Sequence, residues 1–481
     1  MSKKVQIKAI SEKLITERLQ FENPWWITGR TEEFYSVLKK RLYFESFHKL
    51  VEETDVRRAV VLMGPRRVGK TVMMQHSVQN LLENKVSPGK IVFINIENPI
   101  YNNRGLEELM RLALTASGGT SPGGYFIYFD EIQYLKNWEV HLKSLVDSYP
   151  HTKFIVSGSA SAALKLKSAE SGAGRFTEFH LPPLTFFEYI SLKEYTNLIK
   201  PGPLSWQGNL TSYFTTPNIK EMNRYFLHYI NFGGYPEVIF NEKIQSDPGR
   251  YIKNDIIDKV LLRDLPSLYG IQDVQELNSF FTTLAYNTGN EISLEGLSQS
   301  SGADKNLLKK YLEYLEAAFL IKVVNRVDDN SKKFKRVTFY KVYLTNPSLR
   351  SALFAPVDSN DELIGNIVET AVFSQLFHKP GFMPWYARWN QGRNNGEVDL
   401  LGLDPQRLKP SWIAEIKWSN RFFTNETSLK SLFYFMEKNN MKSALVTTLT
   451  ETGVKEINGI TIHFVPAALY ALAAGAYNIS L

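Results

Sequence analysis

The sequence predicts a mixed α/β protein that is built around a P-loop nucleotide-binding core. Two observations carry this prediction. A glycine-rich pattern, G-x-x-x-x-G-K-[ST], lies between an apolar run and a helical segment, which is the order that a phosphate-binding loop requires. Farther along the chain, a second apolar strand ends in two adjacent acids. Downstream of both, a helical block and a second set of acids indicate further domains.

The glycine-rich pattern follows the strand-like run 58–63 and consists of Gly64-Pro65-Arg66-Arg67-Val68-Gly69-Lys70-Thr71. Its two glycines let the main chain curl with the N–H groups pointing inward, and the helix that continues through Val72 adds its positive end. We expect Lys70 to contact the β- and γ-phosphates of ATP, and the Thr71 hydroxyl to hold Mg²⁺. Residues 64–72 are therefore the predicted ATP-binding residues.

The two acids are Asp130 and Glu131, at the end of the apolar run 124–129. A buried parallel strand explains the apolar run, but it does not explain two carboxylates at its carboxyl end, where ligands bind in α/β proteins. A helix N-cap would explain one acid but not the pair. We expect Asp130 to bind Mg²⁺ through water and Glu131 to polarise the attacking water. The spacing resembles the Walker A and Walker B motifs of AAA+-like ATPases.

Three more residues are candidates for the ATP site. Ser157 and Ser159 end the strand-like run 153–159 and resemble a sensor-1 position, where a hydroxyl contacts the γ-phosphate or the attacking water; a turn cap explains them equally well. Arg175 follows a Gly/Ser-rich run and is a candidate arginine finger that stabilises the transferred charge. A surface salt bridge is the alternative interpretation of Arg175.

Composition limits the class of protein. The 481 residues include no cysteine, which excludes disulfides and cysteine-ligated zinc. The first residues lack the apolar core of a signal peptide, and the most apolar segment, near 464–476, is too short to span a bilayer. We therefore expect a cytoplasmic protein with no membrane partner. The formal charge of +7 is compatible with binding to nucleic acid but does not demonstrate it.

Helix-turn-helix features appear after the ATPase core. A helix over 274–287, a second helix that Ser293 precedes and a third that Asp304 caps are followed by the strand-like runs 320–324 and 337–344. This order predicts a winged helix. Basic residues that could contact DNA phosphates lie on the third helix and in the loop between the strands: Lys305, Lys309, Lys332, Lys333, Lys335 and Arg336. A solvated helix face and a protein-interaction module are the alternatives.

The C-terminal region carries a second set of acids. Glu369 lies on a predicted helix and Asp399 on a strand, while Glu415 and Lys417 share one face of the next strand at a period of two. This layout resembles the PD-(D/E)xK nuclease core of archaeal Holliday-junction resolvases and restriction-endonuclease-like enzymes, although the usual Pro-Asp is absent. The resemblance implies that Asp399 and Glu415 hold Mg²⁺, that Glu369 completes the metal shell and that Lys417 orients water. An ordinary α/β domain, or a nuclease fold that binds DNA without cutting it, are the alternatives.

Together these motifs resemble the bacterial and archaeal ATPases that carry an AAA_14-type domain followed by a DUF4143 region. The P-loop, the Asp130-Glu131 pair, Gly174-Arg175, the segment 182–188 and the turn 233–236 carry the resemblance, and the C-terminal acids extend it. It implies five segments: an N-terminal helical segment (1–53), a P-loop ATPase core (54–183), a helical lid (184–265), a winged-helix domain (266–350) and a restriction-endonuclease-like α/β domain (351–481).

The sequence thus predicts a Mg²⁺-dependent ATPase that acts on DNA, with ATP and DNA as partners and a nuclease-like C-terminal domain. A regulatory NTPase switch, with the winged helix as a protein-docking module and an inactive nuclease fold, is the alternative. Because AAA+-like sites often take an arginine from a neighbouring subunit, a homo-oligomeric ring and a monomer both stay open.

Overall fold

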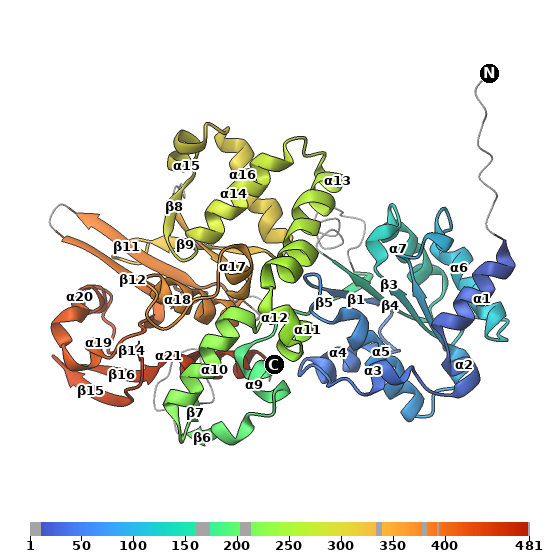
Figure 1. Ribbon diagram of the computed structural model, residues 1–481, viewed down its shortest axis with the longest axis horizontal. Coiled ribbons are helices and arrows are strands. Elements are labelled where there is room, and N and C mark those ends of the chain that lie inside the picture. The colour runs from blue at the N-terminus through green and yellow to red at the C-terminus, as the bar shows by residue number, and fades with distance from the viewer. Residues whose placement is uncertain are drawn as a thin grey trace. The chain divides into compact units, whose positions relative to one another are not determined.

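The structure is a computed structural model that describes residues 11–159, 174–202, 213–332, 339–377, 382–391 and 394–479. The chain forms two compact units, Met1–Leu181 and Pro182–Leu481. Figure 1 labels most of the helices and strands of both units. The first unit contains the predicted N-terminal segment and the P-loop core, and the second contains the remaining three predicted segments.

The first unit is organised by a parallel five-stranded sheet in the order β2-β3-β4-β1-β5. Its central strands are almost wholly buried apolar runs, as expected for a sheet that is covered on both faces. The strands are β1 (Ala59–Met63), β2 (Ile91–Asn95), β3 (Phe126–Asp130), β4 (Lys153–Gly158) and β5 (Phe176–His180). The longer helices between them are α5 (Lys70–Glu83), α6 (Leu106–Ala116) and α7 (Trp138–Ser148).

The N-terminal helices precede this sheet, and their connection covers the outer edge of strand β2. They are α1 (Glu12–Glu22), α2 (Trp25–Thr28), α3 (Glu33–Ser36) and α4 (Phe44–Glu52). Asn23 exchanges two hydrogen bonds with the main chain of Phe93 (2.8 and 2.6 Å), and the indoles of Trp25 and Trp26 both donate to the carbonyl of Ile91 (3.0 and 2.8 Å). These side chains satisfy main-chain groups that an edge strand would otherwise expose.

The second unit is organised by a nine-stranded mixed sheet in the order β15-β16-β14-β13-β12-β11-β9-β10-β8. Pairs β9·β11, β13·β14 and β14·β16 are parallel, and the other pairs are antiparallel. The strands are β8 (Glu291–Ser293), β9 (Ile321–Val327), β10 (Phe339–Leu344), β11 (Trp385–Gln391), β12 (Asn394–Leu403), β13 (Pro410–Glu415), β14 (Ser443–Thr448), β15 (Gly453–Ile457) and β16 (Ile460–Pro466).

The predicted order of the winged-helix segment is present: α14 (Val274–Tyr286), β8, α15 (Leu294–Ser301), α16 (Lys305–Ala317), β9 and β10. Ser293 and Asp304 cap α15 and α16, as the sequence predicts. The predicted boundary at residue 350 does not separate two sheets, however. Strand β9 pairs with β11, with Asn325 opposite Trp385, so that one sheet runs from the winged-helix segment into the C-terminal segment.

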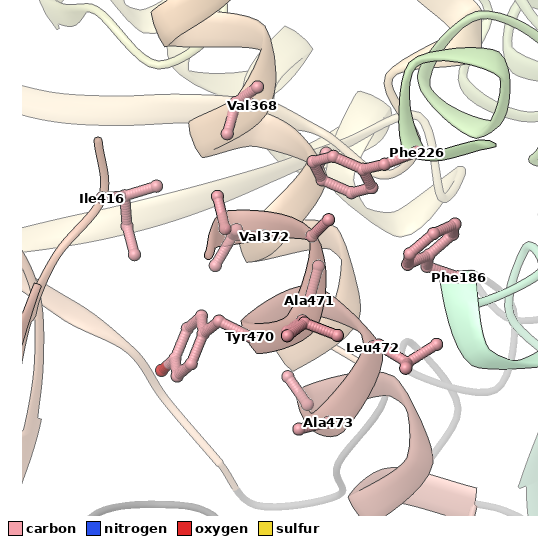
Figure 2. Close-up of a cluster of buried hydrophobic side chains, with 14 of the residues drawn as sticks. Phe186, Phe226, Val368, Val372, Ile416, Tyr470, Ala471, Leu472 and Ala473 are labelled. Atoms are coloured by element: carbon pink, nitrogen blue, oxygen red, sulfur yellow. The ribbon is translucent and has the colours of Figure 1, made fainter. Parts of the chain in front are cut away.

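The predicted helical lid also belongs to the second unit. It contains α9 (Phe186–Leu192), α10 (Ile219–Phe232), α11 (Pro236–Phe240) and α12 (Glu242–Ser246), together with a small sheet of β6 (Lys200–Gly202) and β7 (Tyr213–Thr215) that the sequence did not predict. Figure 2 shows Phe186 and Phe226 beside helices α18 (Ile364–Leu376) and α21 (Ala467–Ile479). Several aromatic side chains of the segment, among them Phe186, Tyr189, Phe226 and Tyr229, are therefore core residues of this unit.

The remaining helical elements connect these parts. Two π-helical stretches, Gly249–Asp258 and Val260–Asp264, lead into α13 (Leu265–Tyr269), and α17 (Ser348–Leu353) follows β10. Near the C-terminus, α19 (Arg421–Thr424) and α20 (Lys430–Lys438) lie between β13 and β14. Among the described residues, none of the helices is long and apolar enough to cross a membrane.

Candidate functional site

The glycine-rich loop connects the end of β1 to the start of α5, as predicted. Gly69 (φ 94°) and Arg67 (φ 65°) both adopt the left-handed conformation that lets the loop curl. A Cβ atom on Gly64 would lie 2.1 Å from the carbonyl oxygen of Leu181, so only glycine fits there. The buried side chain of Lys70 donates to the carbonyls of Gly64 (3.1 Å) and Pro65 (2.8 Å). The loop therefore holds its lysine over its own main chain.

The end of β3 brings the predicted acids to this loop. Asp130 Oδ2 accepts a hydrogen bond from Thr71 Oγ1 at 2.8 Å, and its other oxygen accepts one from the Ser157 hydroxyl. Ser157 Oγ also accepts from the main-chain N–H of Glu131 (3.0 Å). Burial, with a smaller contribution from the charge of Glu131, raises the pKa of Asp130 to about 6, against the opposing effects of Ser157, Thr71 and Lys70. Thr71 and Asp130 thus offer adjacent oxygen donors of the kind that Mg²⁺ prefers.

Glu131 occupies a strained position. Its backbone is left-handed (φ 54°), which is uncommon for a residue with a side chain and is found most often at functional sites. Its carboxylate accepts a hydrogen bond from the Gln133 amide, and Gln133 Oε1 in turn accepts from the main-chain N–H of Ser159 (3.2 Å). Sequence reasoning missed Gln133, although an amide two residues after the acid pair was a visible signal.

The N-terminal segment contributes a second residue that the sequence did not predict. Buried Arg41 donates from Nη1 to the carbonyl of Val68, within the glycine-rich loop, at 2.6 Å. No sequence signal pointed to this contact, because Arg41 lies 27 residues before Val68, outside any recognisable motif. Through this contact, the segment that precedes α4 holds the glycine-rich loop.

The structure does not bring Arg175 to the phosphate loop of its own chain. Its carbonyl accepts from the N–H of Ala59 (2.9 Å), and its Nε donates to Asp147 Oδ1 (2.5 Å). Because β1 and β5 are parallel and pair Ala59 with Phe176, Arg175 lies at the amino end of the sheet, whereas the loop follows the carboxyl end of β1. Within one chain, the salt-bridge interpretation of Arg175 is the correct one.

A second group of charged residues lies in the second unit, and we call it the acid centre: Glu369, Glu397, Asp399 and Glu415 with Lys341 and Lys417. The pairing of Leu400 with Ala414 places Asp399 and Glu415 side by side on β12 and β13. Lys417 Nζ lies 2.6 Å from Asp399 Oδ2 and 2.7 Å from Glu415 Oε2. The structure therefore brings together the three residues that resemble a nuclease core.

Glu369 accepts hydrogen bonds from other residues than Asp399 and Glu415 do. Its Oε1 accepts from Lys341 Nζ (2.8 Å) and from the Tyr343 hydroxyl (2.6 Å), and Lys341 Nζ also lies 2.6 Å from Glu397 Oε1. Sequence reasoning missed Lys341, which comes from β10 and is only 3% exposed. A lone lysine inside an otherwise apolar and aromatic strand was the signal that could have revealed it.

Burial and the charge of neighbouring groups shift the pKa values of the acid centre, in opposite directions at Asp399, Lys341 and Lys417. Burial alone would raise the pKa of Asp399, but the ammonium groups of Lys417 and Lys341 outweigh it and lower that pKa. Burial and the charge of Asp399 raise the pKa of Glu415 well above its usual value. Burial would lower the pKa of Lys341, but Glu369, Asp399 and Glu397 raise it. Lys417 follows the same pattern, because Asp399 and Glu415 raise its pKa against the effect of burial. Both lysines are therefore held in the charged form.

The acid centre does not fit the predicted metal shell. Among the residues that the structure describes, no three acid or histidine side chains are arranged to hold a metal ion. Asp399 Oδ2 already accepts from Lys417 Nζ and from the N–H of Ile416 (2.9 Å), and Glu369 is turned to Lys341 and Tyr343. The prediction that Glu369 completes a shell with Asp399 and Glu415 is thus not supported by the geometry.

Two of the predicted DNA-contacting lysines differ in their surroundings. Lys305 Nζ donates to Glu295 at 2.7 Å, whereas Lys309 lies exposed on the same helix, α16. In the loop after β9, Lys332 is exposed, and Lys333, Lys335 and Arg336 lie outside the described residues. The start of this loop is attached to the C-terminal segment, because Asp329 accepts from Lys438 and its carbonyl accepts from Asn439 Nδ2 (2.9 Å).

Comparison with known families supports the first unit as an AAA+-like ATPase domain. Residues 56–190 match the model of an AAA domain, AAA_14. Residues 223–361 match a domain of unknown function, DUF8612, and not the DUF4143 region that the sequence resemblance implied. Neither match reaches the residues that resemble a nuclease, because Glu369, Asp399 and Glu415 all lie beyond residue 361.

Two similar proteins are described only as uncharacterized. The chain is 27% identical to the uncharacterized protein MJ1544 of Methanocaldococcus jannaschii over 351 residues, or 71% of each chain. It is 23% identical to an uncharacterized protein of Haemophilus influenzae, over 87% of this chain and 95% of that one. The Aeropyrum pernix ORC1 protein in complex with DNA aligns at 11% identity and a TM-score of 0.30, covering 68% of this chain and 95% of that one. That TM-score is too low to support an argument about this chain.

Proposed function

We propose that this protein is a Mg²⁺-dependent ATPase that couples ATP hydrolysis to the binding or remodelling of DNA. The contact that carries the ATPase part is the 2.8 Å hydrogen bond between Thr71 and Asp130. It joins the helix after the phosphate loop to the end of the acidic strand, so that the two groups that would hold Mg²⁺ are adjacent before the metal arrives. Bound ATP supplies the reactive phosphoanhydride and Mg²⁺ supplies positive charge to it.

In the proposed site, each residue around the triphosphate has a different role. The main-chain amides of the glycine-rich loop and the start of α5 bind phosphate oxygens, and Lys70 turns from its carbonyl acceptors to the β- and γ-phosphates. Glu131 takes a proton from the attacking water. Ser157 positions both acids through its bonds to Asp130 and to the Glu131 amide, and Gln133 orients the Glu131 carboxylate.

ATP turnover by site variants tests the ATPase part. Glu131→Gln should retain ATP binding and lower turnover by about 10²–10⁴-fold, the usual contribution of a general base. Ser36→Ala is a matched control, because its exposed hydroxyl bonds only locally to the carbonyl of Glu33. Equal turnover by Glu131→Gln and the unaltered protein would remove Glu131 from this role.

The DNA part rests on the helix order α14, α15, α16 followed by β9 and β10, and on basic residues at the positions where winged helices contact phosphates. ATP turnover is measured with no DNA and with duplex, single-stranded and four-way DNA. The proposal expects stimulation by at least one of these. The combined Lys332/Lys333/Lys335→Ala variant should weaken DNA binding and flatten its salt dependence by about one unit of slope for each phosphate that these lysines neutralise. Binding that is unchanged in this variant would contradict the proposal.

A regulatory NTPase switch is the second candidate. It is supported by the attachment of Asp329, at the start of the loop after β9, to Lys438 of α20 and to Asn439, because a loop that is bonded to its own unit also suits a protein-docking module. This candidate expects ATP turnover that no DNA alters, together with nucleotide-dependent assembly. Mass photometry with and without ATP measures that assembly.

A further inference from the structure

The acid centre contains its own cations. Lys417 bridges Asp399 and Glu415, and Lys341 bridges Glu369 and Glu397, with all four N–O distances between 2.6 and 2.8 Å. The two lysines therefore contact all four carboxylates. Three of those carboxylates are nearly buried, since Glu369, Asp399 and Glu415 are 9%, 6% and 4% exposed. Buried carboxylates need a partner of opposite charge, and here each has one.

A divalent cation would compete with these lysines for the same oxygen atoms. Mg²⁺ binds its oxygen ligands at about 2.0–2.1 Å, so an ion on Asp399 Oδ2 or Glu369 Oε1 would lie against an ammonium group. Lys417 could withdraw, because its side chain is 24% exposed. Lys341 has no such route: its side chain is 3% exposed, and β10 lies between β9 and β8 in the sheet.

The bonds of Lys341 continue into a chain of ion pairs. Glu397 also meets Arg388 (3.4 Å), Arg388 meets Glu291 (3.3 Å), and Glu291 meets Arg326 (3.1 Å). These residues come from β12, β11, β8 and β9, so the pairs cross the junction where β9 and β11 join the winged-helix strands to the C-terminal strands. Lys341 therefore occupies a structural position in that junction and is not a surface cation that a metal could displace.

We propose that Lys341 and Lys417 stand in the acid centre in place of a divalent cation, so that this centre binds no Mg²⁺ or Mn²⁺ and holds the joined sheet together without cutting DNA. This inference does not depend on the proposed ATPase function, because it concerns residues of the second unit alone. Of the two charged centres, Thr71 with Asp130 is then the one that is open to a metal ion.

Mn²⁺ binding to the nucleotide-free full-length protein tests the proposal. Electron paramagnetic resonance counts bound Mn²⁺ in the unaltered protein and in Asp399→Asn, and the difference isolates the acid centre from any other ion. The proposal expects no difference, and no cleavage of duplex or four-way DNA with Mg²⁺ or Mn²⁺. One Mn²⁺ per chain that Asp399→Asn removes, or cleavage that Asp399→Ala and Lys417→Ala abolish, would overturn it.

Removing the buried lysine provides the converse test. Lys341→Met leaves Glu369 without its cation and leaves Glu397 with Arg388 alone, so it should lower the melting temperature and create Mn²⁺ affinity that is at least roughly tenfold above that of the unaltered protein. Lys309→Met is the control, since Lys309 is exposed on α16. If Lys341→Met does not fold, Lys341→Met/Glu369→Gln removes one charge of each sign and should recover the fold. Unchanged melting in Lys341→Met would contradict a structural role for Lys341.

Discussion

The two charged centres of this chain use the same residue types in opposite ways. At the phosphate loop, Lys70 donates to two main-chain carbonyls, and Asp130 is held by the hydroxyls of Thr71 and Ser157. In the acid centre, Lys341 and Lys417 donate directly to carboxylates. Under the proposed function, the first arrangement provides a cation for a triphosphate and an anion for Mg²⁺. The second arrangement satisfies its charges internally.

The pKa shifts of the two central aspartates express this difference. Asp130 and Asp399 are both buried, yet the pKa of Asp130 rises to about 6, whereas that of Asp399 falls below its usual value. Burial raises the pKa of both aspartates; the charge of Glu131 adds to that effect at Asp130, whereas the charges of Lys417 and Lys341 outweigh it at Asp399. The comparison teaches that an acid-and-lysine motif in a sequence does not by itself identify a metal site, because the partner of the lysine determines what the acids can bind.

Replacing Lys70 or Lys341 with methionine should give the largest effects, on ATP turnover at the phosphate loop and on stability at the acid centre. Lys70→Met should abolish measurable ATP hydrolysis, because it removes the ammonium group that reaches the phosphates, and should change stability little. Lys341→Met should leave ATP turnover intact and lower the free energy of unfolding by about 3–5 kcal/mol, the usual cost of breaking a buried ion pair. Turnover assays and urea denaturation of both variants measure this. Loss of ATP turnover in Lys341→Met, in protein that remains folded, would show that the centres are coupled.

The pH dependence of stability should reveal the raised pKa of Asp130. The folded protein holds the Asp130 proton up to about pH 6, whereas the unfolded chain releases it near pH 4, so stability falls as the pH rises through that window. Asp130→Asn should therefore be more stable than the unaltered protein at pH 7, by up to about 3 kcal/mol, since one pKa unit is worth about 1.4 kcal/mol. Below about pH 4 the difference should vanish.

The stability advantage of Asp130→Asn should be reduced or reversed when Mg²⁺ and ATP are added. Mg²⁺ and ATP favour the charged carboxylate, so their addition should stabilise the unaltered protein and fail to stabilise Asp130→Asn. Thermal melting at about pH 4, 6 and 7.5, with and without Mg²⁺ and ATP, measures both effects. Equal melting temperatures at every pH would mean that Asp130 titrates in the folded chain as it does in the unfolded one.

Gln133→Ala should have an intermediate effect on ATP turnover. Without the amide, the Glu131 carboxylate loses the donor that links it to the main-chain N–H of Ser159, and its strained backbone loses a restraint. We expect turnover to fall by about tenfold with little change in KM for ATP, as for other residues that orient a catalytic group. Gln133→Glu separates orientation from bulk, since it retains the size of the side chain but repels Glu131. Turnover that stays normal in both variants would reduce Gln133 to a structural bond.

The sequence predicted the elements that follow a local pattern. The strand, loop and helix around Gly64 and Lys70, and the capped helices at Ser293 and Asp304, all depend on neighbouring residues, which a motif or a period records. It did not predict the bonds of Asn23 to Phe93 or of Arg41 to Val68, because those partners are 70 and 27 residues apart and share no motif. The joined sheet was missed for the same reason: nothing in β9 or β11 alone specifies their pairing.

The candidate site residues likewise include some that the sequence predicted and some that it did not. Asp399, Glu415 and Lys417 were predicted to lie together because their layout resembles a nuclease core, and the structure brings them together. The sequence could not show that Lys341 of strand β10, 28 residues before Glu369, donates to that glutamate on helix α18. The sequence left two roles open for Arg175, because its position in the chain does not show at which end of β5 it lies; the structure shows the salt bridge to Asp147.

The smallest effect concerns two lysines on one helix, and it extends the comparison to the surface. Lys305 donates to Glu295, whereas Lys309 is exposed on α16, so a DNA phosphate near Lys305 would have to compete with a carboxylate. Lys309→Ala should therefore flatten the salt dependence of DNA binding by about one unit of slope, and Lys305→Ala by less. Titrations at several salt concentrations measure both slopes, and Glu295→Gln should bring the contribution of Lys305 up to that of Lys309. Slopes that equal the slope of the unaltered protein in all three variants would mean that α16 does not contact phosphates, and the protein-docking interpretation of the winged helix would then be preferred.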